Sequence, residues 1–458
     1  MQFFMEKCII YILKLIEKCK IMFRKIESFI TEYFESSPNK ILIIDGARQI
    51  GKSYIIRKKG HELFKNYIEI NLLEDSLNDR LFENTKKTED FYLQLSMFAG
   101  DRLDKKENTL VFLDEIQAYP HLLTLLKFLK QDDKFTYIAS GSLLGVTLSQ
   151  TSSIPMGSIE VKHMYPMDFE EFLIANKFGT LAIESLKEKF NKKEPLDENL
   201  HNRMLDLFKK YILSGGLPDA VKTFIETSNI VKVRTIQNEI HNYYGLDASK
   251  YDMEKKLKVK RIYDMIPSNL ENKKKRVRVQ NIEEKKGKRF SDYQDEFDYL
   301  INAGIALEVR AVSNPVFPLD ENSSKNLLKL YLNDAGILSG ILYQNNIRAV
   351  LDTQRSVNLG TVYEAVVAQE LKAHGKKLFY YDNKSKGEVD FLINDYENLS
   401  VLPIEVKSGK DYTIHSALDS FIKNPDYNIK NGIVLSNEQN IYTENGITYL
   451  PVYFVMFL

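Results

Sequence analysis

Cysteine is scarce in this 458-residue sequence, which excludes a fold held together by disulfides. The two cysteines, Cys8 and Cys19, form no zinc-binding pattern with each other or with the seven scattered histidines. So little use of cysteine is typical of a reducing compartment, and we therefore expect a cytoplasmic protein.

The sequence also lacks net charge and a long apolar run. Lys plus Arg and Asp plus Glu both number 63, so the overall charge does not indicate a partner. The most apolar stretch, residues 8–13, is far shorter than the roughly 18–20 residues of a membrane span. No small-residue cleavage site follows it, so we expect neither a membrane protein nor a secretory signal. Residues 3–34 predict a helix, and Met22 is an alternative start.

The strongest motif is a glycine-rich loop after a short apolar run. Residues 46–53 read Gly-Ala-Arg-Gln-Ile-Gly-Lys-Ser and fit the phosphate-binding pattern at each fixed position. The run 40–44 predicts a buried parallel strand, and a helix is expected after the loop. Lys52 would hold the β- and γ-phosphates of ATP, and Ser53 would bind Mg²⁺. The predicted nucleotide-binding residues are Gly46, Ala47, Arg48, Gln49, Ile50, Gly51, Lys52, Ser53 and Tyr54.

Two more strand ends carry polar residues that suit nucleotide hydrolysis. Asp114 and Glu115 follow the apolar run 110–113, where the first can hold Mg²⁺ and the second can polarise the attacking water. Ser142 follows the strand 135–139 and can sense the γ-phosphate. With strands at 67–71 and 158–162, the pattern predicts an α/β fold with a parallel sheet. The predicted catalytic residues are Lys52, Asp114, Glu115 and Ser142.

Eight segments together resemble a known family, the prokaryotic AAA-type (AAA_14-like) ATPases that carry a C-terminal DUF4143 domain. These segments are 46–53, 113–117, 140–145, 165–172, 215–218, 334–337, 388–391 and 404–408. The resemblance implies an AAA+ P-loop core, a helical lid, a winged-helix-like segment and a restriction-endonuclease-like domain. The predicted parts are an N-terminal helical extension (1–35), the ATPase core (36–172), the lid (173–250), the winged-helix-like basic domain (251–345) and the PD-(D/E)xK nuclease-like domain (346–458).

One feature of many AAA+ ATPases is missing from its usual place. No arginine lies between Arg102 and Arg203, where an arginine finger is often found. Arg48, Arg80 and Arg102 are the candidates to replace it, and the sequence does not rank them.

A strongly basic segment lies at residues 255–289. It has fourteen Lys or Arg residues against four Asp or Glu residues, a net charge of +10. Helices expected at 257–266 and 291–303, followed by strands at 305–312 and 327–332, indicate a winged helix. Such a segment favours binding to nucleic acid, chiefly duplex DNA, through its phosphates. A solvated basic face or a protein-docking surface is the alternative.

The last hundred residues predict an acidic cluster. Residues 388–394 and 401–407 form a hairpin whose register would place Asp390 opposite Glu405, with Lys407 on the same face. Glu364, on a helix at 361–373, would complete a site for Mg²⁺ or Mn²⁺. This is the D…ExK arrangement of nucleases. A degenerate nuclease fold kept for docking or regulation is the alternative.

Two functions follow from these predictions. In the first, an ATPase cycle controls a DNA-binding, metal-dependent nuclease half. In the second, the chain is a nucleotide-dependent switch with slow turnover that recruits a protein partner through a non-cleaving module. The sequence leaves open whether the chain forms a homo-oligomer.

Overall fold

The computed structural model describes residues 22–36, 38–142, 157–248, 256–283, 287–352, 358–383, 387–409 and 411–458. Its contacts define an N-terminal unit, Arg24–Tyr165 with Asn302–Ile305, and a C-terminal unit, Pro166–Ile301 with Ala306–Leu458. Most of the helix predicted at 3–34 falls outside the described residues, and α2 (Lys25–Glu35) is its described end. No helix within the described ranges is both long and apolar enough to cross a bilayer.

A parallel sheet of five strands forms the centre of the N-terminal unit, in the order β2-β3-β4-β1-β5. Each strand was predicted, because each is a short run of apolar and β-branched residues. The strands are β1 (Ile41–Asp45), β2 (Asn66–Asn71), β3 (Thr109–Asp114), β4 (Thr136–Gly141) and β5 (Ile159–His163).

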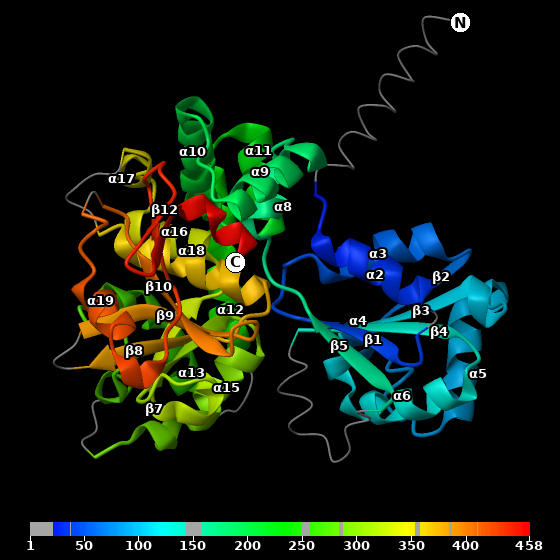
Figure 1. The fold of residues 1–458 in the computed structure, drawn as a ribbon. Helices are drawn as coiled ribbons and strands as arrows, with labels where there is room; N and C mark the ends of the chain where they lie inside the picture. Colours follow the sequence, from blue (N-terminus) through cyan, green and yellow to red (C-terminus); the bar gives the residue numbers. More distant parts are fainter. Residues whose placement is uncertain are drawn as a thin grey trace, which may run out of the picture. The chain divides into compact units, whose positions relative to one another are not determined.

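Helices cover both faces of this sheet, as Figure 1 shows. Alternate residues of β1 point to opposite faces, so Ile41 and Ile43 join a core that also contains Phe91 of α5 and Leu126 of α6. The helices of this unit are α2, α3 (Lys52–Leu63), α4 (Leu72–Leu77), α5 (Thr88–Ala99) and α6 (Pro120–Asp132). The layers are those of an α/β P-loop domain, as the sequence predicted.

The C-terminal unit is rich in helices. The helices of the expected lid, residues 173–250, belong to this unit. There α10 and α12 pack against α16, and α10 also contacts α18. The helices are α8 (Phe169–Ala175), α9 (Thr180–Lys192), α10 (Glu198–Ser214), α11 (Pro218–Thr227), α12 (Ile230–Ala248), α13 (Lys256–Asp264), α14 (Ile266–Glu271), α15 (Gln294–Asn302), α16 (Ala335–Tyr343), α17 (Arg348–Leu351), α18 (Gly360–Ala373) and α19 (Ser416–Ile422).

One mixed sheet of eight strands runs through this unit, in the order β12-β13-β11-β10-β9-β8-β6-β7. The strands are β6 (Ala306–Val312), β7 (Ser323–Leu332), β8 (Phe379–Asn383), β9 (Gly387–Asp395), β10 (Ser400–Val406), β11 (Gly432–Ser436), β12 (Tyr442–Glu444) and β13 (Ile447–Pro451). The predicted pair β6 and β7 is antiparallel, but it forms no separate wing. Because β6 also pairs with β8, the two strands are one edge of the larger sheet.

A buried carboxylate joins three segments of the C-terminal unit. Asp334, the N-cap of α16, accepts hydrogen bonds from the backbone N–H groups of Gly216 at 2.6 Å and Ile337 at 2.9 Å. The carbonyl of Gly216 accepts one from the N–H of Met167 at 2.7 Å. A Cβ at Gly215 would lie 2.2 Å from an Asp334 oxygen, so that position requires glycine. The segments 215–218 and 334–337 therefore meet at the Asp334 carboxylate, and Gly216 links them to the segment 165–172.

We expect Asp334→Ala to lower the free energy of unfolding by about 2–4 kcal/mol, because at least two buried N–H groups lose their acceptor. Urea unfolding followed by circular dichroism measures the loss. Asp320→Ala is the matched control, since Asp320 is an exposed partner of Lys377 and its removal should cost under about 1 kcal/mol. Equal losses in the two variants would contradict the role of Asp334.

Candidate functional site

The glycine-rich loop lies between β1 and α3, at the edge of the sheet where parallel strands end and ligands usually bind. Gly46 has a φ of 141° and Gly51 a φ of 94°, conformations that favour glycine. A Cβ at Gly46 would also lie 2.2 Å from the carbonyl oxygen of Met164. Because Gly51 is the N-cap of α3, the first N–H groups of that helix lie at the loop, as an anion site requires.

Lys52, the first residue of α3, is buried within the loop. Its ammonium donates to the carbonyl oxygens of Gly46 at 2.8 Å and Ala47 at 2.7 Å. Burial lowers the pKa of Lys52, and the carboxylates of Glu115 and Asp114 oppose this only in part. A phosphate chain in the loop would favour the charged ammonium, so the residue suits the role predicted for it.

Asp114 ends β3 beside two hydroxyl groups. Ser53 Oγ donates to Asp114 Oδ1 at 2.9 Å, and Ser140 at the end of β4 donates to the same oxygen. Burial raises the pKa of Asp114, and the two hydrogen bonds oppose the shift. A hydroxyl and a carboxylate side by side are the oxygen ligands that P-loop proteins use for Mg²⁺. Ser53 and Asp114 therefore fit the predicted cation.

Glu115, Gln117 and Ser142 form a hydrogen-bonded network next to this pair. Glu115 has a φ of 55°, which is uncommon for a residue other than glycine. Ser142 Oγ donates to Glu115 Oε2 at 3.1 Å, while Gln117 Nε2 donates to the same carboxylate and to Ser142 Oγ. The network fixes a carboxylate beside a hydroxyl, an arrangement that can orient a water molecule. The sequence had given Gln117 no role.

The three candidate arginines lie in different surroundings. Arg48 Nε donates to Ser142 Oγ at 3.3 Å, and its charge contributes to the low pKa of Lys52. Arg80 pairs with a surface glutamate, and Arg102 donates to carbonyl oxygens at the end of α5. Of the three, Arg48 is the arginine at the nucleotide site.

Arg24, which belongs to none of the sequence motifs, contacts the glycine-rich loop. This buried guanidinium donates to the carbonyl oxygens of Ile50 at 2.8 Å and Tyr165 at 2.6 Å. Behind the loop, Asp45 at the end of β1 pairs with His163 at 3.0 Å. The sequence predicted neither contact, because a single arginine or histidine far along the chain leaves no spacing pattern.

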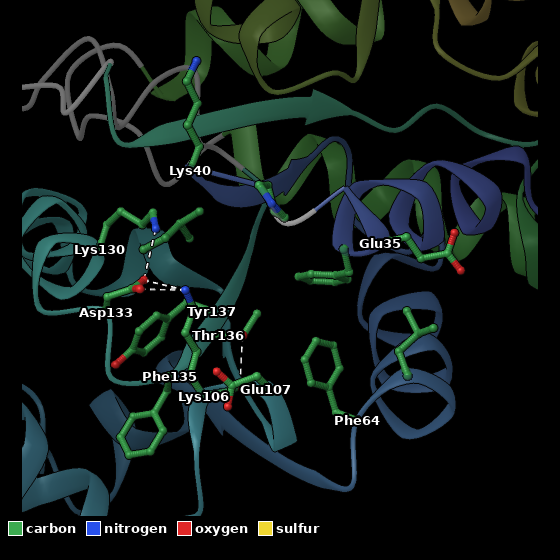
Figure 2. Close-up of a pocket in the computed structure, with 14 residues that line it drawn as sticks. Glu35, Lys40, Phe64, Lys106, Glu107, Lys130, Asp133, Phe135, Thr136 and Tyr137 are labelled. Carbon is green, nitrogen blue, oxygen red and sulfur yellow. Dashed lines mark hydrogen bonds and ion pairs between the residues drawn. The ribbon is translucent and has the colours of Figure 1, made fainter.

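A cavity of about 410 Å³ also lies in the N-terminal unit (Figure 2). It is lined by residues that precede or begin β1, β3 and β4, so it lies at the end of the sheet opposite the loop. Its Lys106 and Lys130 both pair with Asp133, at 2.7 and 3.1 Å. It is therefore separate from the nucleotide site, and two of its lysines share one carboxylate.

The predicted hairpin of the C-terminal unit has the predicted register. In the antiparallel pair of β9 and β10, Ile404 lies opposite Phe391, so the next step places Glu405 opposite Asp390. Asp390 Oδ2 accepts a hydrogen bond from the N–H of Val406 at 2.9 Å. The hairpin therefore brings together the two strand carboxylates that the sequence proposed as metal ligands.

Glu364 of α18 belongs to the same cluster. Burial raises the pKa values of Glu364 and Glu405, the latter to about 8, and the negative charge of Asp390 raises both further. Lys407 donates to Glu405 Oε1 at 2.8 Å. The four predicted residues thus interact electrostatically, and Lys407 is a direct partner of Glu405.

The sequence missed two lysines of this cluster. Lys275, from the basic segment, pairs with Glu364, whose other oxygen accepts from the Tyr331 hydroxyl at 3.2 Å. Lys329 of β7 pairs with Glu388 of β9 and is almost completely buried. These contacts were not predictable, since Lys275 lies 89 residues and Lys329 lies 59 residues from its partner.

The carboxylates as placed do not fit a metal ion. Within the part of the chain that the structure describes, no three or more His, Cys, Asp or Glu side chains are positioned to hold one. Lysines occupy one oxygen each of Glu364 and Glu405. The cluster therefore has the ligand types for Mg²⁺ or Mn²⁺ but not the arrangement.

Three family models match the chain. An AAA domain matches residues 38–173, and two domains of unknown function, DUF8612 and DUF4143, match residues 205–348 and 359–455. The resemblance to AAA-type ATPases with a DUF4143 domain is thereby confirmed.

Individual relatives are distant. An uncharacterised protein of Methanocaldococcus jannaschii is 24% identical over 400 residues, which cover 85% of this chain and 78% of that protein. A Walker-type ATPase of Pyrococcus abyssi is 14% identical, with a TM-score of 0.41 over 69% of this chain and 95% of the other. The RuvB Holliday junction branch migration motor of Thermotoga maritima is also 14% identical. Its TM-score is 0.31, and the match covers 62% of this chain and 89% of the RuvB chain.

Lys52→Ala should abolish ATP binding, because no other ammonium group has this position in the loop. Glu115→Gln should still bind ATP but hydrolyse it about 100-fold more slowly or worse, since only the carboxylate that activates water is lost. Titration with a fluorescent ATP analogue and phosphate release measure the two effects. Lys59→Ala, which removes an α3 lysine paired with Glu62, is the control. Wild-type hydrolysis by Lys52→Ala would disprove the site.

Proposed function

We propose that the chain hydrolyses ATP in its N-terminal unit and uses this cycle to control a C-terminal unit that binds DNA. The observation that carries the ATPase is the loop itself, where Lys52, the Ser53–Asp114 pair and Glu115 meet at one edge of the sheet. The match of residues 38–173 to an AAA domain supports it. Mg²⁺, when bound, would neutralise charge on the transferring phosphoryl group.

Within this ATPase, we assign to Arg48 the role of the missing arginine finger. Its guanidinium is tied to Ser142, and Ser142 is tied to Glu115, the proposed water-activating residue. A positive charge there would stabilise the negative charge that develops during phosphoryl transfer, without a second subunit.

DNA binding is proposed for the basic segment, but only some of its residues suit the role. Lys274 and Arg276 lie 3.4 and 3.7 Å from Asp382, and Lys275 pairs with Glu364. The sequence predicted phosphate contacts for the segment as a whole. The exposed residues are the better candidates, because binding DNA would break no ion pair with Asp382 or Glu364: Lys273, Arg278, Lys288 and Arg289.

Metal-dependent cleavage by Glu364, Asp390, Glu405 and Lys407 remains a prediction. It requires a second Mg²⁺ or a Mn²⁺ ion, and therefore a state in which Lys275 has left Glu364. The Lys275–Glu364 pair favours the second candidate function, a switch whose nuclease-like module does not cleave. ATP turnover measured with and without duplex DNA separates the two candidate functions. DNA should stimulate an ATPase that controls a DNA-binding unit, but it should not stimulate the switch.

Arg48→Ala should slow ATP hydrolysis about 100-fold or more while ATP affinity changes little, because the charge is needed chiefly in the transition state. Single-turnover phosphate release and nucleotide titration measure the two quantities. Arg102→Ala, which removes an arginine of the same unit outside the site, should behave as wild type. Unchanged hydrolysis by Arg48→Ala would exclude this residue as the finger.

Replacing Lys273, Arg278 and Lys288 together by alanine should weaken duplex binding and reduce the slope of log affinity against log salt by up to about three phosphate contacts. Fluorescence anisotropy across a salt series measures both. The matched control replaces three exposed residues of the α9 region, Lys187, Lys192 and Lys193. If the two triple variants have the same affinity and slope, the basic segment is not the DNA-binding surface.

A further inference from the structure

The carboxylates of the acidic cluster in the C-terminal unit are buried, so the water that they have lost must be replaced by hydrogen bonds, protons or positive charges. Glu364 is 4% exposed and Glu405 is 7% exposed, with Asp390 opposite Glu405 in the hairpin. Carboxylates brought this close repel one another, and either a bound proton or a nearby cation relieves the repulsion. Lys407 supplies one positive charge, on Glu405 Oε1.

Lys275 supplies another positive charge, on Glu364. Its side chain is only 17% exposed, although it comes from a run of basic residues that the sequence predicted to contact nucleic-acid phosphates. Burial by itself would lower the pKa of Lys275, but the charges of Glu364 and Asp390 outweigh burial and raise the pKa. The negative charges of two of the three carboxylates that the sequence proposed as metal ligands therefore act on this ammonium.

The ion pairs do not satisfy the whole cluster. Glu405 Oε2 is buried and, among the described residues, has no hydrogen-bond partner. Buried polar atoms are nearly always paired, so an unpartnered acceptor beside Asp390 is a position where a further cation would gain a ligand.

The segment that carries Lys275 is weakly attached. Residues 272–278 lie between α14 and the following short 3-10 helix, outside any helix or strand. The N–H of Val277 donates to the carbonyl of Leu328 at 2.9 Å, and Lys274 and Arg276 contact Asp382 at 3.4 Å or more. Partly exposed pairs at such distances contribute little stability, so the buried Lys275–Glu364 pair is the strongest ionic attachment of this segment.

We propose that Lys275 is an internal counter-ion that keeps divalent metal ions out of the cluster of Glu364, Asp390 and Glu405 while residues 272–278 are docked. The proposal rests on the proposed function, because it concerns regulation of the same nuclease-like cluster. Both oxygens of Glu364 are occupied in the docked state, Oε1 by Lys275 and Oε2 by the Tyr331 hydroxyl, so a divalent ion that takes Glu364 as a ligand must displace the ammonium. Metal binding and docking of the segment are therefore mutually exclusive.

The test is Mn²⁺ binding to the full chain, measured by calorimetry without nucleotide or DNA. Lys275→Met removes the charge but keeps much of the side-chain volume, and it should bind Mn²⁺ at least about tenfold more tightly than wild type. Adding Asp390→Asn to this variant should reverse the gain. Equal affinity of wild type and Lys275→Met would overturn the proposal.

A second variant tests the proposal without removing the partner of Glu364. Replacing Lys274 and Arg276 by alanine frees the segment from Asp382 and should also increase Mn²⁺ affinity, by less than Lys275→Met does. The matched control replaces Lys273 and Arg278, two exposed residues of the same segment, and so has the same change of charge. Equal affinities of these two double variants would show that docking does not control the metal.

A nicking assay on supercoiled DNA separates this inference from the proposed nuclease. If Lys275→Met binds Mn²⁺ but cuts no DNA, metal exclusion stands and cleavage is disproved. If wild type already binds Mn²⁺ tightly in a manner that depends on Asp390, Lys275 does not exclude the metal.

Discussion

Compensation of buried charge is the constraint on which both sites depend. A buried ionic group is costly unless hydrogen bonds or an opposite charge replace the water that it has lost. Asp334 is compensated by backbone N–H groups, although burial still raises its pKa to about 6. Lys52 is compensated by two loop carbonyls, which a phosphate can replace with a stronger partner. Glu364 is compensated by a lysine of the same chain, the one that we propose excludes divalent metal ions.

The features predictable from the sequence were those encoded locally. The five parallel strands follow from short apolar runs, and the loop follows from the spacing of its glycines and Lys52. The hairpin register was predictable because a short turn joins its two strands, which fixes the partner of Asp390. By contrast, the edge pair β6 and β7 was correctly expected as strands but not as part of the larger sheet, since its contact with β8 joins residues about seventy positions apart.

The basic segment shows why charge alone is a weak guide to function. Its net charge of +10 predicted a surface for phosphates, yet at least three of its cations lie on carboxylates of the same unit. A sequence gives the number of charges, whereas their partners depend on the fold. The segments 165–172, 215–218 and 334–337 show the same limit, because the hydrogen bonds that join them at Gly216 and Asp334 depend on the fold.

The proposed DNA binding and the proposed exclusion of metal ions involve the same short segment, residues 272–278. Lys273 and Arg278 are exposed on the segment whose Lys275 is buried against Glu364. If DNA phosphates bind the undocked segment more tightly than the docked one, then bound DNA favours release of Lys275 from Glu364. By reciprocity, release of Lys275 raises the affinity for DNA by the same factor. Metal that enters the cluster then stabilises the undocked segment and strengthens DNA binding in turn. A chain built in this way would bind metal ions in the cluster more tightly when nucleic acid is bound.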